Sequence, residues 1–283
     1  MRGHSALLSA LVERWRPETH TFHLPVGEVT VTLEDVTYIL GLPVNGEPVT
    51  GRTDSSHQFL VENCITCFGR EPGPQDHVLG KVNLAWIRRC RDTEPCDTQE
   101  SIERYVRAHI FCMFGTVVFP DKSTTSLNSK FLPLLRDFHR IPHYSGVIGL
   151  DIQYIYRGLL RILGDDSMTW ELTIRIIFLI GLLVTNVQFI WPPYMGVGVP
   201  DDLAPHLFLC FTQSPLVSLE CIEWHLIDRV RRQFGMQQLP PGPAFDLGRD
   251  HCKRLTGAQN HDWGEIYSQW LTDGELTAIT HYS

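Results

Sequence analysis

The sequence predicts a mainly α-helical fold with small β-hairpins near the N-terminus, and three observations support that prediction. Polar and apolar residues alternate between Phe22 and Val31, which is the period of a half-buried strand. Elsewhere, apolar residues recur at the spacing of one helix face, in segments 5–16, 84–91, 97–117 and 214–235. The 283 residues, 43% hydrophobic and 20% charged, have an ordinary globular composition and can bury a full core.

The first helix is expected over residues 5–16. It should end before Pro17, because proline disfavours the helical conformation of the residue that precedes it. Its apolar face consists of Leu7, Leu8, Leu11, Val12 and Trp15.

The segment from Phe22 to Gly51 carries the densest local signals. Turn residues Pro25 to Glu28 separate two alternating stretches and predict a short hairpin. Asn45-Gly46, further along, predicts a second hairpin.

A short helix is expected between these hairpins. Thr32 is a suitable N-cap, and Glu34 and Asp35 place negative charge in the first turn, where the helix dipole favours it. The helix should run to Leu40 and end at Gly41, a natural left-handed terminator.

Residues 52–80 are predicted to be irregular, with Gly69, Pro72, Gly73 and Pro74 marking a loop. A short helix should begin at Leu84. Asp97 to Glu100 then resembles a capping box, with Asp in place of the usual Ser or Thr. The four-turn helix that follows has an apolar stripe of Ile102, Tyr105, Val106, His109, Ile110, Met113, Phe114 and Val117.

A further helix is expected from Ile148 to Leu163, closed by Gly164. The stretch Ile176–Val199 contains no charged residue and is long enough to span a membrane. Polar and proline residues interrupt it, so a buried helix or strand is the favoured interpretation and a membrane span the alternative: Asn186, Gln188, Pro192 and Pro193.

The late part of the chain predicts two more helices. Ser214 to Gly235 is expected to form one helix with an apolar stripe, ended by Gly235. Asp262 to Glu265 should cap the last helix, which carries Ile266, Tyr267, Trp270 and Leu271. The stripe of the longer helix consists of Leu219, Ile222, Leu226, Val230 and Phe234.

Charge and cysteine usage narrow the class of protein. The net charge of -8 argues against nucleic-acid binding driven by bulk charge, although a local basic face remains compatible with it. Eight irregularly spaced cysteines fit reduced intracellular thiols better than a disulfide framework. Met1 is followed by an amphipathic stretch and no secretory signal is visible.

The densest polar set lies between Glu220 and Arg232. His225 and Asp228 would be its acid–base or metal pair. The members cannot all converge on one helix, and no nucleophile or third ligand lies nearby, so a solvated face with local ion pairs is favoured. The six residues predicted to form an interaction surface are Glu223, Trp224, His225, Asp228, Arg229 and Arg232.

Cys64 and Cys67 raise the hypothesis of a zinc site. One Cys-x-x-Cys without a second pair is a weak zinc pattern, so buried or incidental thiols are favoured. We predict no metal and no cofactor. The other residues of this hypothesis are Cys90, Cys96, His57 and His77.

Two enzyme classes find little support in the residues. Metallophosphatase motifs occur only as fragments, at Gly164-Asp165 and Asn260 to Asp262. The carboxylate pairs Asp165-Asp166 and Asp201-Asp202 are typical of turns and caps. A pyridoxal enzyme needs a Schiff-base lysine in a cofactor setting, and none of the lysines has one: Lys81, Lys122, Lys130 and Lys253.

The sequence nevertheless resembles the plant mobile domain family. The residues that carry the resemblance are ALVERWRPETHTFHLPVGEVTVTLEDVTYILGLPVNGEPVTG (10–51), FPDKS (119–123), LPLLRDF (132–138) and EWHLIDRVRRQFG (223–235). The chain departs from the family at Ile227, where proline is common, and in lacking a recognisable Trp-rich central helix. The resemblance covers roughly residues 5–145 and 191–272.

This resemblance implies one plant mobile domain over residues 5–272, truncated at its N-terminus, atypical at 146–190 and followed by a tail at 273–283. It also implies a non-enzymatic nuclear interaction module in meristem development and in gene or transposon silencing. The expected partner is a phosphatase-7-like protein or another nuclear protein. Family labels such as "aminotransferase-like" and "phosphatase 7 long form homolog" make an enzyme an alternative.

A transposon-derived nucleic-acid-binding protein is a further alternative. Arg88, Arg89 and Arg91 could contact phosphates while Trp86 stacks on bases. A surface cluster offset by Asp92 and Glu94 is the favoured interpretation of these arginines.

Overall fold

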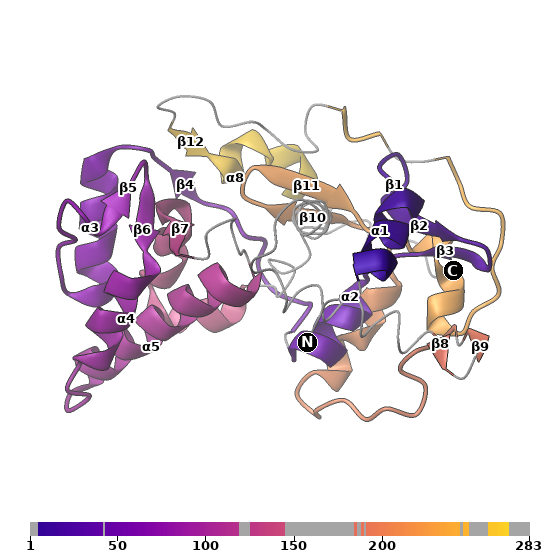
Figure 1. Ribbon diagram of the computed structural model, residues 1–283, viewed down its shortest axis with the longest axis horizontal. Coiled ribbons are helices and arrows are strands. Elements are labelled where there is room, and N and C mark those ends of the chain that lie inside the picture. The colour runs from indigo at the N-terminus through magenta and orange to yellow at the C-terminus, as the bar shows by residue number, and fades with distance from the viewer. Residues whose placement is uncertain are drawn as a thin grey trace. The chain divides into compact units, whose positions relative to one another are not determined.

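The computed structural model describes residues 5–41, 43–118, 125–144, 184–185, 188–189, 191–243, 246–248 and 260–271. The chain forms two compact units (Figure 1), each assembled from segments distant in sequence. The terminal unit comprises Met1–Pro48, Ser145–Lys253 and Gln269–Ser283, and the central unit comprises Val49–Tyr144 and Arg254–Ser268. Both contain helices and short antiparallel sheets, so the mainly α-helical class is right in outline, but strands also occur far from the N-terminus.

The terminal unit begins with helix α1 (Ser5–Arg14) and a three-stranded antiparallel sheet. Trp15, Phe22 and Val29 are partners across its strands, and all three are buried. The predicted first hairpin is confirmed. The predicted helix ends two residues early, because Trp15 and Arg16 pair with the next strand. The strands are β1 (Trp15–Arg16), β2 (Thr21–Leu24) and β3 (Gly27–Val29).

The short helix after this sheet is also confirmed. Helix α2 (Leu33–Asp35) continues directly as the π-helix η1 (Val36–Leu40). The Asp35 carboxylate accepts the Thr32 N–H at 2.6 Å, which caps the start. Gly41 ends the helix in the left-handed conformation, with φ 64°.

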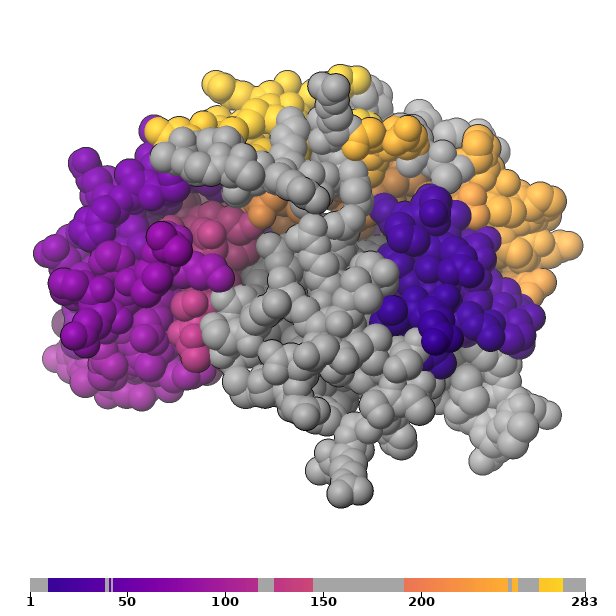
Figure 2. Space-filling model, turned by 45° about the horizontal axis from the view of Figure 1, so that its top comes forward, coloured from indigo at the N-terminus to yellow at the C-terminus, as the bar shows by residue number. Residues whose placement is uncertain are grey.

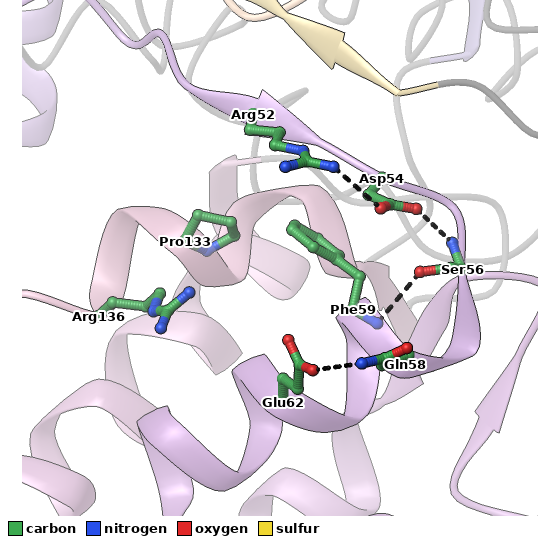
Figure 3. Close-up of a pocket in the computed structure, with 8 residues that line it drawn as sticks. All are labelled: Arg52, Asp54, Ser56, Gln58, Phe59, Glu62, Pro133 and Arg136. Atoms are coloured by element: carbon green, nitrogen blue, oxygen red, sulfur yellow. Dashed lines mark hydrogen bonds and ion pairs between the residues drawn. The ribbon is translucent and has the colours of Figure 1, made fainter.

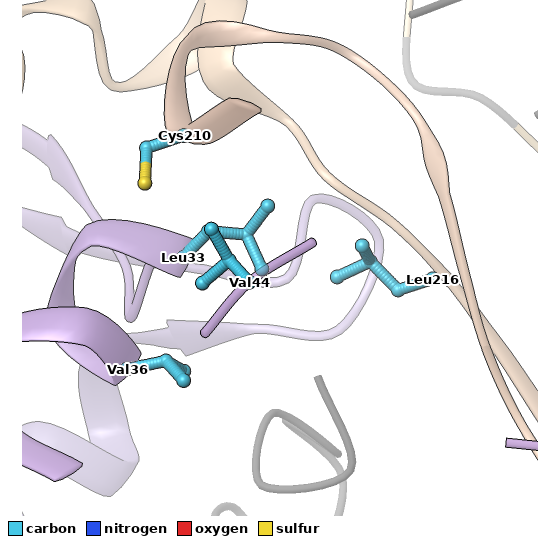
Figure 4. Packing of buried hydrophobic residues seen from close by; sticks show 5 residues of the cluster. All are labelled: Leu33, Val36, Val44, Cys210 and Leu216. Atoms are coloured by element: carbon cyan, nitrogen blue, oxygen red, sulfur yellow. The ribbon is translucent and has the colours of Figure 1, made fainter. Parts of the chain in front are cut away.

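The second hairpin predicted from Asn45-Gly46 is wrong. Residues 43–51 contain isolated bridge positions in place of two strands paired across this turn. Val44 turns inward, and its burial fixes this segment more strongly than the turn preference does. It belongs to a buried cluster (Figure 4) made of Leu33, Val36, Val44, Cys210 and Leu216.

The long helix predicted over residues 214–235 is wrong as well. Pro215 to Trp224 form a hairpin in which Val217 lies opposite Ile222, and Leu219, with φ 46°, turns the chain. β-branched residues fit a strand well, and a two-residue turn requires positive φ. Leu219, Ile222 and Val230 are nevertheless buried. The apolar pattern therefore predicted which residues are buried, but not the type of secondary structure.

The described late elements of the terminal unit are short. They are β8 (Val184–Thr185), β9 (Gln188–Phe189), η6 (Ala204–Phe211), β10 (Pro215–Ser218), β11 (Cys221–Trp224), η7 (Ile227–Arg229) and η8 (Arg231–Phe234). The indigo N-terminal segment and the orange late segment of this unit lie side by side (Figure 2), and hydrogen bonds join them.

The central unit contains a helix that the sequence reading missed. Helix α3 (His57–Phe68) spans twelve residues of the segment predicted to be irregular. Ser56 caps it by accepting the Phe59 N–H, and Gly69 ends it with φ 68°. Its buried face includes Cys64 and Cys67, which act as small apolar residues rather than as ligands.

Helices α4 (Leu84–Asp92) and α5 (Gln99–Met113) confirm two predictions, and α5 continues as the π-helix η2 (Phe114–Val118). The cap of α5 is Thr98 with Ser101, not Asp97 with Glu100. The predicted apolar stripe is also wrong, since Ile102, Tyr105 and Met113 are exposed. The buried face instead includes Ser101, Arg107, Ala108, Phe111 and Cys112.

Arg107 explains why the apolar periodicity of α5 predicted the wrong buried face. Its guanidinium donates to the carbonyl oxygens of Leu135 at 2.9 Å and Arg136 at 3.5 Å, and pairs with Glu103 at 2.9 Å. A charged side chain with these partners can occupy a buried position. The inward face of α5 therefore looks polar in sequence, and its outward face looks apolar.

The rest of the central unit consists of short pieces around these helices. The last described segment returns to pair with its first strand, and Asp262 caps the final helix as predicted. The elements are β4 (Arg52–Thr53), β5 (His77–Val78), β6 (Lys81–Asn83), β7 (Ser126–Asn128), η3 (Ser129–Leu135), η4 (Phe138–His143), β12 (His261–Asp262) and α8 (Trp263–Ile266).

Several predictions fall outside the described residues, namely the helix at 148–163, the pair Asp165-Asp166 and most of 176–190. Of the apolar stretch Ile176–Val199, the described residues include two short paired strands and the buried Tyr194. Across the described part of the chain, no helix is both long enough and apolar enough to cross a membrane.

Candidate interaction site

Glu223 and His225, two residues of the predicted interaction surface, are buried in the terminal unit. The Glu223 carboxylate lies 2.8 Å from His20 Nδ1. His225 Nδ1 lies 2.8 Å from the Thr212 carbonyl oxygen, an acceptor, so this nitrogen carries the proton. Burial lowers the pKa of His225 to about 4, against this hydrogen bond, which raises it, so the imidazole is neutral at pH 7.

Asp228 and Arg229 bind other parts of the same unit. Asp228 Oδ2 accepts the Gly242 N–H at 3.0 Å. The Arg229 guanidinium lies 3.3 Å from both oxygens of Glu28, a carboxylate on the N-terminal hairpin that also accepts the Thr21 hydroxyl at 2.9 Å. His225 and Asp228 therefore face different partners and do not form the hypothetical acid–base pair.

Arg232, in η8, contacts the same hairpin. It donates to the Val26 carbonyl oxygen at 3.1 Å, and its guanidinium stands 5.1 Å from the centre of the Trp191 ring. A Cβ on Gly27 would approach the Trp191 ring to 2.9 Å, so only glycine fits this close approach. Trp224, the sixth predicted residue, is half-buried on β11 opposite Pro215.

Gln233, which the sequence reading did not select, makes the most specific contact of this motif. Its Oε1 accepts the Thr30 N–H at 2.8 Å, and its Nε2 donates to the Thr30 carbonyl oxygen at 2.9 Å. Both residues are buried. The motif at 223–235 therefore attaches the late chain to the N-terminal hairpin, and its arginines and glutamine act mainly within the protein.

A second buried polar group connects α2 to residue 194. Asp35 accepts the Tyr194 hydroxyl at 2.5 Å in addition to the Thr32 N–H, and Tyr194 stacks on Tyr38 with ring centres 4.3 Å apart. Burial raises the pKa of Asp35 to about 6, although these hydrogen bonds lower it, so the group is a carboxylate at neutral pH. The contact holds residue 194 against α2.

Glu34, beside Asp35, should make the stability of the terminal unit depend on pH. Burial, and then the charge of Asp35, raise the pKa of Glu34 from 4.5 to about 7. The stability that depends on a protonated Glu34 is fully present below pH 4.5 and is lost as the pH rises through 7. Glutamine stays uncharged at both pH values. After allowance for partial exposure, we therefore expect the effect of Glu34→Gln on the free energy of unfolding to be more stabilising at pH 8 than at pH 5, by about 1–2 kcal/mol.

Urea denaturation at both pH values, followed by circular dichroism, checks this expectation. The exposed Glu18→Gln is the matched control and should show no such difference. A parallel pH dependence of the wild-type and Glu34→Gln proteins would contradict it.

The described residues of the zinc hypothesis do not gather into one metal-binding group. Cys64, Cys67 and Cys90 are buried, and burial raises the pKa of Cys67 to about 12 and of Cys90 to about 11, so these thiols stay protonated. His57 Nε2 and His77 Nε2 form a pair at 3.2 Å. Within the described ranges, no three His, Cys, Asp or Glu residues are placed to hold a metal ion.

The arginine cluster of α4 lacks the aromatic surface proposed for base stacking. Trp86 is buried against Phe68, which makes that part of the hypothesis wrong. Arg89 pairs with Asp76 and Arg91 with Asp92, each at 2.8 Å. Two of the three arginines therefore have carboxylate partners, and Asp92 is one of the two acids predicted to offset them. The other, Glu94, lies 3.8 Å from Arg70 instead.

An open pocket of about 390 Å³ lies within the central unit (Figure 3). The Phe59 ring and Pro133 lie between the Arg52 side chain on one side and Arg136 and Glu62 on the other. β4, the first turns of α3 and the end of η3 supply these residues. The remaining lining residues are Asp54, Ser56 and Gln58.

The sequence reading missed this pocket, although one signal was present. Arg136 lies in the family motif LPLLRDF, directly after the buried Leu134 and Leu135. A charged residue that follows a buried pair in a recognisable motif marks a surface position next to the core. Arg52 comes from a strand that only pairing with β12 defines, and no sequence signal places it beside Arg136.

Taken together, the two units define a mainly helical protein with a pocket and internally paired motif residues. The chain belongs to the plant mobile domain family, whose model matches residues 1–178 and 179–278. It is 31% identical, over 94% of its length, to the Serine/threonine-protein phosphatase 7 long form homolog of Arabidopsis thaliana, and covers 24% of that protein. No solved structure matches the chain.

Two further relatives from Arabidopsis thaliana are similar over nearly the whole chain. Protein MAIN-LIKE 1 is 27% identical over 97% of the chain, which covers 62% of that protein. Protein MAINTENANCE OF MERISTEMS is 28% identical over 91% of the chain, which covers 63% of it. The chain therefore spans less than two thirds of each of these relatives.

Proposed function

We propose that this protein is a non-enzymatic interaction module that acts in the nucleus, in meristem development and in silencing of genes or transposons. Family membership and the name of one relative, Protein MAINTENANCE OF MERISTEMS, support this proposal. The partner we propose is a phosphatase-7-like protein or another nuclear protein. The relative named as a phosphatase 7 long form homolog motivates that choice.

The observation that best supports the proposal is that residues of the late family motif, 223–235, bind other parts of the same protein. Arg229, Arg232 and Gln233 bind the N-terminal hairpin rather than surrounding a reaction centre. His225 is neutral and buried, with its proton directed to a backbone carbonyl. A motif engaged in this way holds the N-terminal hairpin and the late chain together, and this favours a structural role for the motif residues over a catalytic one.

Affinity capture from plant nuclei tests the proposal. Full-length protein on beads should retain a phosphatase-7-like protein identified by mass spectrometry. The matched control is the same bait carrying both Trp263→Ala and Gln233→Ala, which we expect to be largely unfolded and to retain none. A folded bait that repeatedly fails to retain any such protein contradicts the choice of partner. Phosphoester hydrolysis with Mn²⁺, or transamination with pyridoxal phosphate, would contradict the non-enzymatic proposal.

A further inference from the structure

The pocket between β4, α3 and η3 has more positive charge available for a ligand than its composition indicates. It is lined by two arginines, Arg52 and Arg136, and by two acids, Asp54 and Glu62. Counted formally, these charges cancel. Their contacts within the protein are unequal, however, and this inequality decides what the pocket can bind.

The Asp54 carboxylate is largely occupied by the protein itself. It accepts the Ser56 N–H at 2.7 Å and lies 3.8 Å from the Arg52 guanidinium, and 14% of its side chain is exposed. With its NH₂ turned toward Asp54, the Asn260 amide donates to both carboxylate oxygens, at 3.0 and 2.8 Å. Asp54 therefore has little capacity left for a ligand.

The two guanidinium groups retain most of their donors. Arg52 has an exposed side chain, and its distance to Asp54 is longer than a hydrogen bond. Within the described residues, the hydrogen bonds of Arg136 come from its backbone: its N–H donates to the Pro133 carbonyl oxygen at 3.3 Å and its carbonyl oxygen accepts from Arg107 at 3.5 Å, while its guanidinium forms no hydrogen bond or ion pair. Each guanidinium can present a planar pair of N–H groups, a geometry that matches a carboxylate.

The remaining pocket walls restrict the rest of the ligand. The Phe59 ring and Pro133 offer an apolar surface between the arginines (Figure 3). Glu62 accepts one hydrogen bond from Gln58 at 2.8 Å and keeps further acceptor sites for an N–H group. Its charge, with the net charge of -8 on the chain, disfavours phosphates and other polyanions.

We propose that this pocket binds a carboxylate of a partner peptide, held by Arg52 and Arg136, with a neighbouring apolar side chain against Phe59. The inference rests on the proposed function as an interaction module and names the chemistry that a partner must present. A peptide supplies the required groups together, because its backbone N–H can reach Glu62 while its carboxylate faces the arginines.

Fluorescence anisotropy with labelled peptides tests this. The probes are fluorescein-Gly-Phe-Glu-Phe-Gly-amide, its Gln analogue, and fluorescein-Gly-Phe-Gly-Phe with a free C-terminal carboxylate. The full chain should bind at least one carboxylate probe about five- to tenfold more tightly than the Gln probe, as expected for a partly exposed charge-assisted hydrogen bond. Comparison of the two carboxylate probes shows which kind of carboxylate the pocket prefers. Tighter binding of the Glu probe indicates an internal acidic side chain, and tighter binding of the other probe indicates a C-terminus.

Arg136→Gln and Arg52→Gln should each remove most of this preference. Both residues are exposed, so these variants should melt at the wild-type temperature. Arg88→Gln, on an exposed arginine outside the pocket, is the matched control and should retain the preference. Equal affinity for the Glu, Gln and free-carboxylate probes would overturn the proposal, and so would an Arg136→Gln variant with unchanged binding. A short oligothymidylate that binds more tightly than the peptides and loses binding in Arg136→Gln would reassign the pocket to polyanions.

The same variants separate this inference from the proposed function. If Arg136→Gln still retains the phosphatase-7-like protein from nuclei and the peptides show no preference, only the pocket assignment fails. If the peptides bind as expected and no phosphatase-7-like protein is retained, only the choice of partner fails.

Discussion

Replacing Trp263 by alanine is expected to lower the free energy of unfolding of the central unit by about 3–5 kcal/mol. Trp263 is 0% exposed and is among the largest fully buried side chains of the described chain. Its indole N–H donates to Thr53 Oγ1 at 3.0 Å, and its backbone N–H donates to the Gly51 carbonyl oxygen at 3.1 Å. Alanine would leave a cavity and an unpaired hydroxyl where β12 returns to β4.

Two further variants identify the cause of this loss. Trp263→Phe keeps most of the buried ring and should lose only about 1–2 kcal/mol, mainly through the hydrogen bond to Thr53. Ile266→Ala, on the exposed side of α8, should cost less than about 1 kcal/mol. Urea denaturation measures the three values. Hydrogen exchange should localise the loss to peptides over α3 and leave those over β10 and β11 unchanged; uniform loss over both units would contradict it.

The second large effect is expected for Gln233→Ala, which should destabilise the terminal unit by about 2–6 kcal/mol. The variant leaves both the N–H and the carbonyl oxygen of Thr30 without their partner, and each buried unpaired group costs roughly 1–3 kcal/mol. Thr30 lies at the end of the N-terminal hairpin, so the hairpin and the late chain should lose their attachment together.

Gln237→Ala is the matched control, because Gln237 is exposed four residues further along. It should change the free energy of unfolding by less than about 0.5 kcal/mol. Hydrogen exchange should show faster exchange over residues 21–31 in Gln233→Ala only. Equal stability of the two variants would mean that the Thr30 contact contributes nothing.

The parts of the fold that could be predicted from sequence were those with local chemistry. The first hairpin, the Thr32 start, Gly41 and the Asp262 cap each depend on residues within one or two turns. Helix α3 carried equally clear end signals in Ser56 and Gly69. It was missed because the glycines and prolines between Gly69 and Pro74 were taken to mark the whole of residues 52–80 as irregular, although they lie beyond the end of the helix.

The errors arose where burial and local pattern disagree. The 214–235 segment has apolar residues at both helical and strand-compatible positions, and cross-strand pairing decided between them. The outer face of α5 looks like a core stripe because Arg107 occupies the inner one. The candidate site depends on contacts between segments distant in sequence, such as Arg229 with Glu28. No local sequence pattern predicts that two such residues will meet.

The return of β12 to β4 has a consequence for biosynthesis. The central unit includes Val49–Tyr144 but also Arg254–Ser268, so its sheet partner and its buried tryptophan are translated long after its other helices. While the ribosome makes the intervening residues, the nascent chain exposes the surface that Trp263 will cover. A transcript or a protease cut that removes the final segment would leave that surface open, where chaperones or other chains would bind it.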